Sequence, residues 1–131
     1  MISSVKSFTK IYSIRAPVRE VWQALTDPKK IDAWGGGPAK MEPKAGTKFT
    51  LWGGDIHGTN TKVVPEKILM QDWFSGDWPE PSKVTFTLTG KAYTTEVKLT
   101  HTDIPDDEFS DIKSGWDDYY LEPLKTLLEK K

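Results

Sequence analysis

Residues 53–79, GGDIHGTNTKVVPEKILMQDWFSGDWP, constrain the fold more than any other stretch of the sequence. They contain two segments typical of β-strands, IHGTNTKVV and ILMQDWF, separated by a turn at Pro65-Glu66-Lys67. Two such strands form a sheet face that another apolar element must cover. Residues 106–131 are the only run long enough to do so with one apolar side. The sequence therefore predicts a curved sheet that wraps around a long C-terminal helix.

The C-terminal run carries apolar and aromatic side chains with the 3.6-residue period of an amphipathic helix. Acidic residues at its start suit the positive end of a helix dipole. Pro123 lies inside the run and clashes with the carbonyl group four residues earlier, which predicts a kink near Tyr119. The apolar stripe consists of Phe109, Ile112, Trp116, Tyr119, Tyr120, Leu124, Leu127 and Leu128.

The rest of the chain predicts further strands and two short helices. Residues 5–15 form a first strand, residues 17–25 form a short amphipathic helix, and Asp27 caps a second helical turn. From Ala39 onward the pattern is that of strands in meander order. The predicted fold class is α+β, with about six or seven antiparallel strands around the long C-terminal helix and two short helices after the first strand. The length predicts one domain over residues 1–131.

Composition excludes several classes of protein. The chain has no cysteine, which excludes disulfides, thiolate zinc sites and thiol chemistry. Its net charge of −1, without a basic stripe, argues against nucleic-acid binding. No apolar run approaches the ~18 residues of a membrane span, and MISSVKSFTK lacks the apolar core of a signal peptide. We therefore expect a soluble, cytoplasmic protein with no membrane span.

Charge is unevenly distributed along the chain, because residues 1–101 carry a net charge of +4 and residues 102–131 carry −5. The acidic part is either a solvated helix face or an acidic surface for a basic partner. The pair Trp78-Pro79 is a second candidate for contact with a partner, because a proline-flanked aromatic residue in a turn is often exposed. The predicted partner-contact residues are Trp78, Pro79, Asp106, Asp107 and Glu108.

Three stretches carry a resemblance to a known family: APVREVWQALTDPKKIDAW, AGTKFTLWGGDIHGTNTKVVPEKILMQDWFSGDWPE and SGWDDYYLEPLKTLLEKK. They resemble the START-like, birch-pollen-allergen-like superfamily, and in particular the family of the activator of the heat shock protein 90 ATPase, in its C-terminal domain. The resemblance extends over residues 9–131. It is carried by Gly46, Phe49, Gly58, Val64-Pro65-Glu66-Lys67, Met70, Trp73, Trp78-Pro79, Gly115-Trp116 and Tyr119-Tyr120.

The resemblance implies a helix-grip fold with a cavity between the sheet and the long helix. It also implies a non-catalytic, co-chaperone-like binding or regulatory module whose partner is a heat shock protein 90-type chaperone. In the full activator, this domain works beside a separate N-terminal domain that contacts the middle segment of the chaperone.

A cavity between sheet and helix leaves two further functions open. The first is that of a carrier or sensor of a hydrophobic small molecule, because sites for such ligands are concave and mainly apolar. The residues expected to line this cavity are Trp34, Phe49, Met70, Trp73, Phe86, Leu99, Trp116, Tyr119 and Tyr120.

The second is that of an enzyme similar to the cyclases and dehydratases of the superfamily. His57 or Asp72 would transfer a proton, and Asn60 or a hydroxyl group of Tyr119 or Tyr120 would polarise a carbonyl. Strand alternation places His57 and Asn60 on opposite faces, which argues against their sharing one cavity. No serine lies in a nucleophile-elbow pattern and the two histidines belong to no cluster with metal-ligand spacing, so the sequence predicts no catalytic triad, metal or cofactor.

Overall fold

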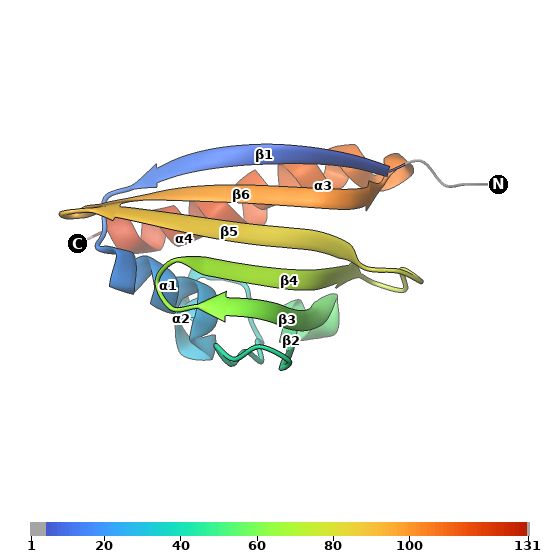
Figure 1. The fold of residues 1–131 in the computed structure, drawn as a ribbon, viewed down its shortest axis with the longest axis horizontal. Helices are drawn as coiled ribbons and strands as arrows, with labels where there is room; N and C mark the ends of the chain where they lie inside the picture. The colour runs from blue at the N-terminus through green and yellow to red at the C-terminus, as the bar shows by residue number, and fades with distance from the viewer. Residues whose placement is uncertain (1–4, 131) are drawn as a thin grey trace.

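The computed structural model describes residues 5–130 and contains a curved sheet of six antiparallel strands (Figure 1). The strands are β1 (Val5–Ile14), β2 (Lys48–Leu51), β3 (Ile56–Val64), β4 (Ile68–Ser75), β5 (Ser82–Lys91) and β6 (Thr94–Pro105). Their order in the sheet is β1-β6-β5-β4-β3-β2, so β2 to β6 form a meander and β1 pairs with β6. Lys40 adds one isolated bridge to Thr50. The predicted α+β fold class is confirmed, with six strands.

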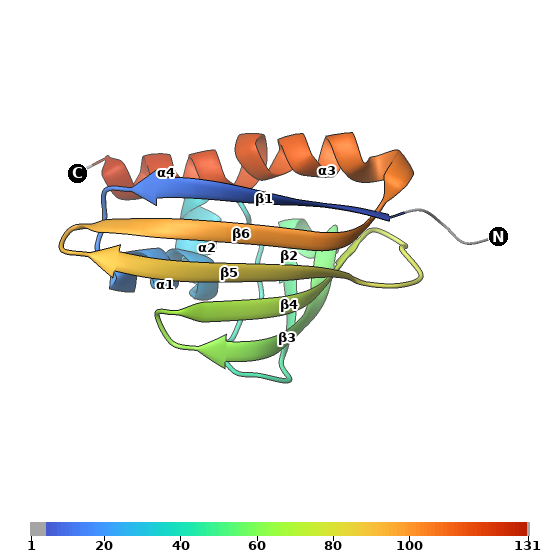
Figure 2. The ribbon, with the colours of Figure 1, turned by 45° about the horizontal axis from the view of Figure 1, so that its top comes forward.

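The helices lie on one face of the sheet (Figures 1 and 2). Two short helices, α1 (Val18–Thr26) and α2 (Pro28–Trp34), follow β1, as predicted. The C-terminal helix consists of η2 (Asp106–Glu108), α3 (Phe109–Gly115), η3 (Trp116–Leu121) and α4 (Glu122–Glu129), and Figure 2 shows it running beside β1 and β6. Its predicted last residue, Lys131, lies outside the described residues. In the described part of the chain, no helix is long and apolar enough to cross a membrane.

Local sequence signals explain the boundary between the two short helices. The Asp27 side chain accepts a hydrogen bond of 3.0 Å from the Lys29 backbone N–H, and Pro28 occupies the first helical position. Gly35 ends α2 in the left-handed conformation with φ 104°, which favours glycine. The predicted cap at Asp27 is therefore confirmed.

Strand alternation places one set of side chains against the helices and the other on the outer face of the sheet. The buried set contains alternate apolar residues of β2, β5 and β6: Phe49, Leu51, Val84, Phe86, Leu88, Val97 and Leu99. At Gly58 a side chain would collide with the Asp72 carbonyl oxygen, so only glycine allows β3 to approach β4 this closely. The register of this pair shifts between Asn60 and Lys62, which marks a bulge and helps to curve the sheet.

The C-terminal helix is irregular at the place where Pro123 predicts a kink. Segment η3 is π-helical over Trp116–Leu121, and Pro123 lies in the first turn of α4. A wider turn before the proline avoids the clash with the carbonyl group of Tyr119 that a regular α-helix would produce. We call η3 the π-turn; it determines which side chains of the helix face the sheet.

Candidate functional site

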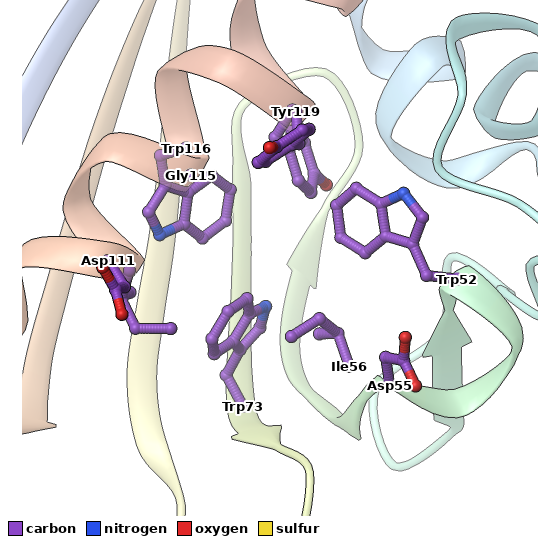
Figure 3. A pocket seen from close by; sticks show the side chains of 10 residues that line it. Trp52, Asp55, Ile56, Trp73, Asp111, Gly115, Trp116 and Tyr119 are labelled. Atoms are coloured by element: carbon purple, nitrogen blue, oxygen red, sulfur yellow. The ribbon is translucent and has the colours of Figure 1, made fainter. Parts of the chain in front are cut away.

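A pocket of about 330 Å³ opens between the C-terminal helix and the ends of β3 and β4 (Figure 3). Its volume lies at the lower end of the roughly 300–1,000 Å³ typical of small-molecule sites. We call it the aromatic pocket. It is lined by Trp52, Asp55, Ile56, Trp73, Asp111, Ile112, Gly115, Trp116, Tyr119 and Tyr120.

The π-turn supplies three of the aromatic walls, Trp116, Tyr119 and Tyr120. Trp116 and Tyr120 are buried, whereas Tyr119 is 68% exposed and stands at the mouth. Adjacent residues of a regular helix point about 100° apart, and the wider turn changes which of them reach the sheet. Single-turn π-helical segments inside α-helices occur frequently at functional sites, which makes this segment a candidate by its geometry.

Trp52 forms another wall and is held in a strained backbone conformation. Its φ of 48° lies in the left-handed region, which is unusual for a bulky residue. The strain is balanced by a hydrogen bond of 2.8 Å from Trp52 Nε1 to the Gly35 carbonyl oxygen and by edge contacts with the rings of Trp34 and Tyr120. Strain of this kind concentrates at functional sites.

Two buried polar atoms of the pocket have no hydrogen-bond partner within residues 5–130: Trp73 Nε1 and the Tyr120 hydroxyl oxygen. Burial raises the pKa of Tyr120, so its hydroxyl group is neutral. Trp73 and Tyr120 are only 4% and 2% exposed, so bulk water does not solvate these atoms freely. Four of the five other tryptophans donate a hydrogen bond from the indole nitrogen: Trp34, Trp52, Trp78 and Trp116. Within residues 5–130, both buried side-chain atoms without a partner belong to residues that line this pocket.

A chain of buried hydrogen bonds lies behind the pocket and centres on His101. Trp116 Nε1 donates to His101 Nδ1 at 2.9 Å, so the neutral imidazole carries its proton on Nε2 and donates it to Ser82 Oγ at 2.7 Å. Ser82 Oγ then donates to the Trp73 carbonyl oxygen at 2.9 Å. Burial lowers the pKa of His101 to about 3, which keeps the ring neutral.

The contact between Ser82 and His101 has the distance of a nucleophile–base pair, but its hydrogen bond runs in the wrong direction for catalysis. A general base must accept the serine proton, whereas here His101 Nε2 is the donor and Ser82 uses its proton on a carbonyl group. An indole donor occupies the position where a catalytic triad has a carboxylate. Both residues are fully buried, so we interpret this chain as structural.

A second polar group fixes the π-turn from the outside. Asp117 accepts hydrogen bonds from Lys10 Nζ at 2.8 Å and from the Tyr12 hydroxyl group at 2.5 Å. Burial tends to raise the pKa of Asp117, but the hydrogen bonds from Lys10 and Tyr12 outweigh burial and lower it. Lys10, which interrupts the apolar side of β1, thus anchors the helix to the sheet.

The structure places the nine predicted cavity residues in three different environments. Trp73, Trp116, Tyr119 and Tyr120 meet in the aromatic pocket. Met70 lies on the outer face of the sheet, because Leu69, Gln71 and Trp73 take the inward positions of β4; its expected place in the cavity was wrong. The remaining residues are buried in the core outside the pocket lining: Trp34, Phe49, Phe86 and Leu99.

The polar candidates do not gather in the pocket. His57 and Asp72 lie on the outer face, where His57 stacks on Phe74 and Asp72 pairs with Lys83. Their expected place in the cavity was wrong because β3 and β4 turn these positions away from the helix. Asn60 is fully buried in a different cluster and donates to the Glu42 carbonyl oxygen at 3.0 Å.

The predicted partner-contact residues lie near one end of the C-terminal helix. Trp78 is half-buried and its Nε1 donates to Glu108 at 2.6 Å, which ties the loop between β4 and β5 to the helix. Asp106 forms a surface ion pair with Lys6. Pro79 and Asp107 are exposed. Within residues 5–130, no group of three His, Cys, Asp or Glu side chains is arranged to hold a metal ion.

Sequence reasoning missed several residues that line the pocket. Trp52 and Ile56 flank a turn, and a signal existed in the two glycines that follow Trp52. Asp55 and Asp111 are exposed acids that lie on opposite sides of the mouth in Figure 3, and no pattern distinguishes them from other surface acids. Gly115 also lines the pocket, and because glycine has no side chain it leaves space there.

A curved antiparallel sheet that grips a long C-terminal helix, with a pocket between them, defines the START-like class of proteins with the helix-grip fold. Within this class, the chain belongs to the family described as Activator of Hsp90 ATPase homolog 1-like protein, whose model matches residues 15–129. The recognition of this family from the sequence is confirmed.

Known proteins similar to this chain include the human Activator of 90 kDa heat shock protein ATPase homolog 1, with 33% identity over 108 residues. That match covers 81% of this chain and 32% of the human protein, so the chain spans about a third of the length of that relative. A crystal structure of an Hsp90 activator from Plasmodium falciparum superimposes with a TM-score of 0.86 at 28% identity, over 93% of this chain and 95% of the other.

A third similar protein comes from a different setting. DynU16, a protein in the dynemicin biosynthetic locus, superimposes with a TM-score of 0.79 at 29% identity. The match covers 95% of this chain and 48% of DynU16. The same fold is therefore found both in activators of a chaperone and in a protein from a biosynthetic locus.

Proposed function

We propose that this protein is a non-catalytic, cytoplasmic binding module that regulates an Hsp90-type chaperone. The observation that supports it most is the family match over residues 15–129, together with 33% identity to the human activator. The similarity to an Hsp90 activator of almost equal length supports a role for this domain by itself.

The proposed contact surface is the acidic end of the C-terminal helix with the neighbouring loop between β4 and β5. Asp107 and Pro79 are exposed there, and the hydrogen bond between Trp78 and Glu108 holds the loop against the helix. The net charge of −5 over residues 102–131 would favour a basic surface on the chaperone.

The test measures the ATPase rate of an Hsp90-type chaperone from the same organism, and complex formation, with and without the purified protein. Asp107→Lys should weaken binding about threefold or more, since charges at an interface rim affect association. Glu96→Lys, the same charge change at the far end of β6, is the matched control and should have no effect. Absence of both binding and rate change would refute the co-chaperone function.

A second candidate function is that of a carrier or sensor of a hydrophobic small molecule. The observation that favours it is the aromatic pocket with two unpaired buried polar atoms. The similarity to a protein from a biosynthetic locus agrees with it. Native mass spectrometry of the protein taken from its own host tests this candidate, because a bound molecule adds a defined mass.

The enzyme hypothesis loses its support from geometry. His57 and Asp72 lie on the outer face of the sheet, away from the pocket. We therefore do not propose acid–base chemistry by these residues.

A further inference from the structure

We infer that the aromatic pocket binds an uncharged, planar aromatic molecule of about two rings that carries a carbonyl-type hydrogen-bond acceptor. This inference rests on the carrier or sensor function proposed above and adds the chemical class of the ligand.

The size of the ligand follows from the volume of the pocket. A cavity of about 150 Å³ lined by apolar side chains accommodates one benzene ring. The aromatic pocket, at about 330 Å³, is roughly twice as large. It therefore fits two fused rings, with a small substituent at the mouth.

The planar shape follows from the walls. The rings of Trp73 and Trp116 stack with centroids 5.5 Å apart and an angle of 27°, and Trp116 lies 4.5 Å from the Tyr120 ring. Figure 3 shows Trp52 facing Trp73 and Trp116 across the pocket. Flat ring faces on two sides favour a flat aromatic molecule over a branched aliphatic one.

The acceptor follows from Trp73, because an indole nitrogen can only donate. Figure 3 shows this nitrogen on the side of the ring that faces Ile56 and Trp52. A ligand that brings a carbonyl oxygen to this point would satisfy a buried donor that lacks a partner within residues 5–130. The Tyr120 hydroxyl group can donate to the same oxygen or accept from the ligand.

The absence of negative charge on the ligand follows from the rim. Asp55 and Asp111 are the charged residues in the pocket lining, and both are exposed carboxylates. An anionic ligand would be repelled by them and would lose its hydration without gaining an opposite charge. A neutral acceptor avoids both penalties.

The position of the donor is fixed before any ligand binds. Trp116 Nε1 is already used by His101, so Trp73 is the indole of this pair that has no partner within residues 5–130. Lys10 and Tyr12 hold the π-turn through Asp117. A preformed site loses little conformational freedom on binding, which favours affinity.

The test uses three probes of equal ring size at pH 7.5: 2-acetylnaphthalene, naphthalene and 2-naphthoate. We expect the neutral ketone to bind about tenfold more tightly than naphthalene, because it pairs buried donors, and 2-naphthoate to bind most weakly. Binding is measured by titration with ¹⁵N-edited NMR of the indole N–H signals. The Trp73 indole proton, assigned with Trp73→Phe, should move downfield with the ketone and not with naphthalene.

Three variants locate the site. Tyr120→Phe removes an unpaired hydroxyl group and should weaken the ketone about tenfold while leaving naphthalene unchanged. Gly115→Phe places a ring over the pocket and should abolish binding of all probes, whereas Gly115→Ala should bind like the original protein. Alanine fits because its side chain would lie 3.9 Å from Tyr119.

The outcomes separate the two levels of the proposal. If naphthalene binds as tightly as the ketone, or if 2-naphthoate binds best, the ligand class is wrong and the carrier function stands. If the ketone binds without moving the Trp73 indole signal, the assigned acceptor site is wrong. If no probe binds, both the ligand class and the carrier function fail.

Discussion

Two buried polar clusters lie on the inner side of β3 and β4, and they differ in how completely their atoms are paired. In the first, Asn60 and Gln71 face each other across the two strands, with Gln71 Nε2 donating to Asn60 Oδ1 at 3.0 Å. Asn60 Nδ2 in turn donates to Thr47 and to the Glu42 carbonyl oxygen. In the second, Trp73 and Tyr120 have no partner within the described residues.

This difference distinguishes a structural cluster from a candidate binding site. A buried polar group with all its hydrogen bonds stabilises one arrangement of the core. A buried polar group without a partner carries a free-energy penalty that a ligand can remove. Both clusters contain neutral groups of similar burial, so hydrogen-bond pairing, and not polarity, indicates where binding is expected.

The largest expected effect comes from breaking the paired cluster. Asn60→Ala should lower the free energy of unfolding by about 3 kcal/mol, because it leaves the buried Gln71 amide without its partner and creates a cavity. Urea unfolding monitored by tryptophan fluorescence measures the change. Thr59→Ala, on the outer face of the same strand, is the control and should lose less than about 1 kcal/mol. Equal losses would contradict the structural role of the cluster.

The next effect concerns pH and the chain around His101. The pKa of His101 is lowered to about 3 in the folded state, against about 6.5 in the unfolded chain. Stability is therefore complete above about pH 6.5 and falls by about 1.4 kcal/mol per pH unit between pH 6.5 and 3, because the unfolded chain takes up a proton first. Unfolding by urea at pH 7 and pH 5 should differ by about 2 kcal/mol.

Two variants test the assignment of this pH dependence. His101→Gln should remove it, even if the variant is less stable at neutral pH, whereas His57→Gln should retain it. Asp117 and Glu129 also have lowered pKa values, but stability that depends on them is lost only as pH falls below the ordinary carboxyl range. An unchanged slope in His101→Gln would show that another group is responsible.

A smaller effect tests how firmly the wall of the aromatic pocket is held. Asp117→Asn should destabilise the protein by about 1 kcal/mol, the upper range for partly exposed ion pairs, because Lys10 loses its carboxylate partner. It should also speed hydrogen exchange of the amides in the π-turn. Asp118→Asn, an exposed neighbour, is the control. If the amides of the π-turn exchange at the same rate in both variants, the ion pair between Lys10 and Asp117 does not hold the π-turn.

The smallest effect tests the unpaired cluster directly. Tyr120→Phe should change the free energy of unfolding by no more than about 0.5 kcal/mol, or should raise it, because the hydroxyl group it removes has no partner among the described residues. Tyr12→Phe removes a hydroxyl group that donates to Asp117 and should cost about 1 kcal/mol. A clear loss in Tyr120→Phe would mean that its hydroxyl group is paired in solution.

The fold could be predicted because its signals are local and repeat. The buried residues Val84, Phe86 and Leu99 follow the alternation of apolar and polar residues in β5 and β6, and the buried residues Trp116 and Tyr120 follow the helical period. In β4 the sequence ILMQDWF allows both faces to look apolar, and Met70 was assigned to the wrong one. The face is decided by Gln71, which is buried because Asn60 pairs with it across the sheet, and no local pattern reports such a contact.

The candidate site could be predicted only in part. Family resemblance and periodicity identified Trp73, Trp116, Tyr119 and Tyr120 as residues between sheet and helix. Which polar atoms remain unpaired depends on distances between segments far apart in the sequence. Trp116 and Trp73 look equivalent in sequence, and only the position of His101 decides that one indole is satisfied and the other is not.

The π-turn also affects how this sequence must be aligned with others. A π-helical turn holds about one residue more than an α-helical turn, so it is equivalent to a one-residue insertion in a regular helix. Side chains before it, such as Ile112, and after it, such as Leu124 and Leu128, follow periods that are offset by about 100°. An alignment that crosses residues 116–121 without allowing a gap would pair inward-facing with outward-facing positions in any relative whose helix is regular.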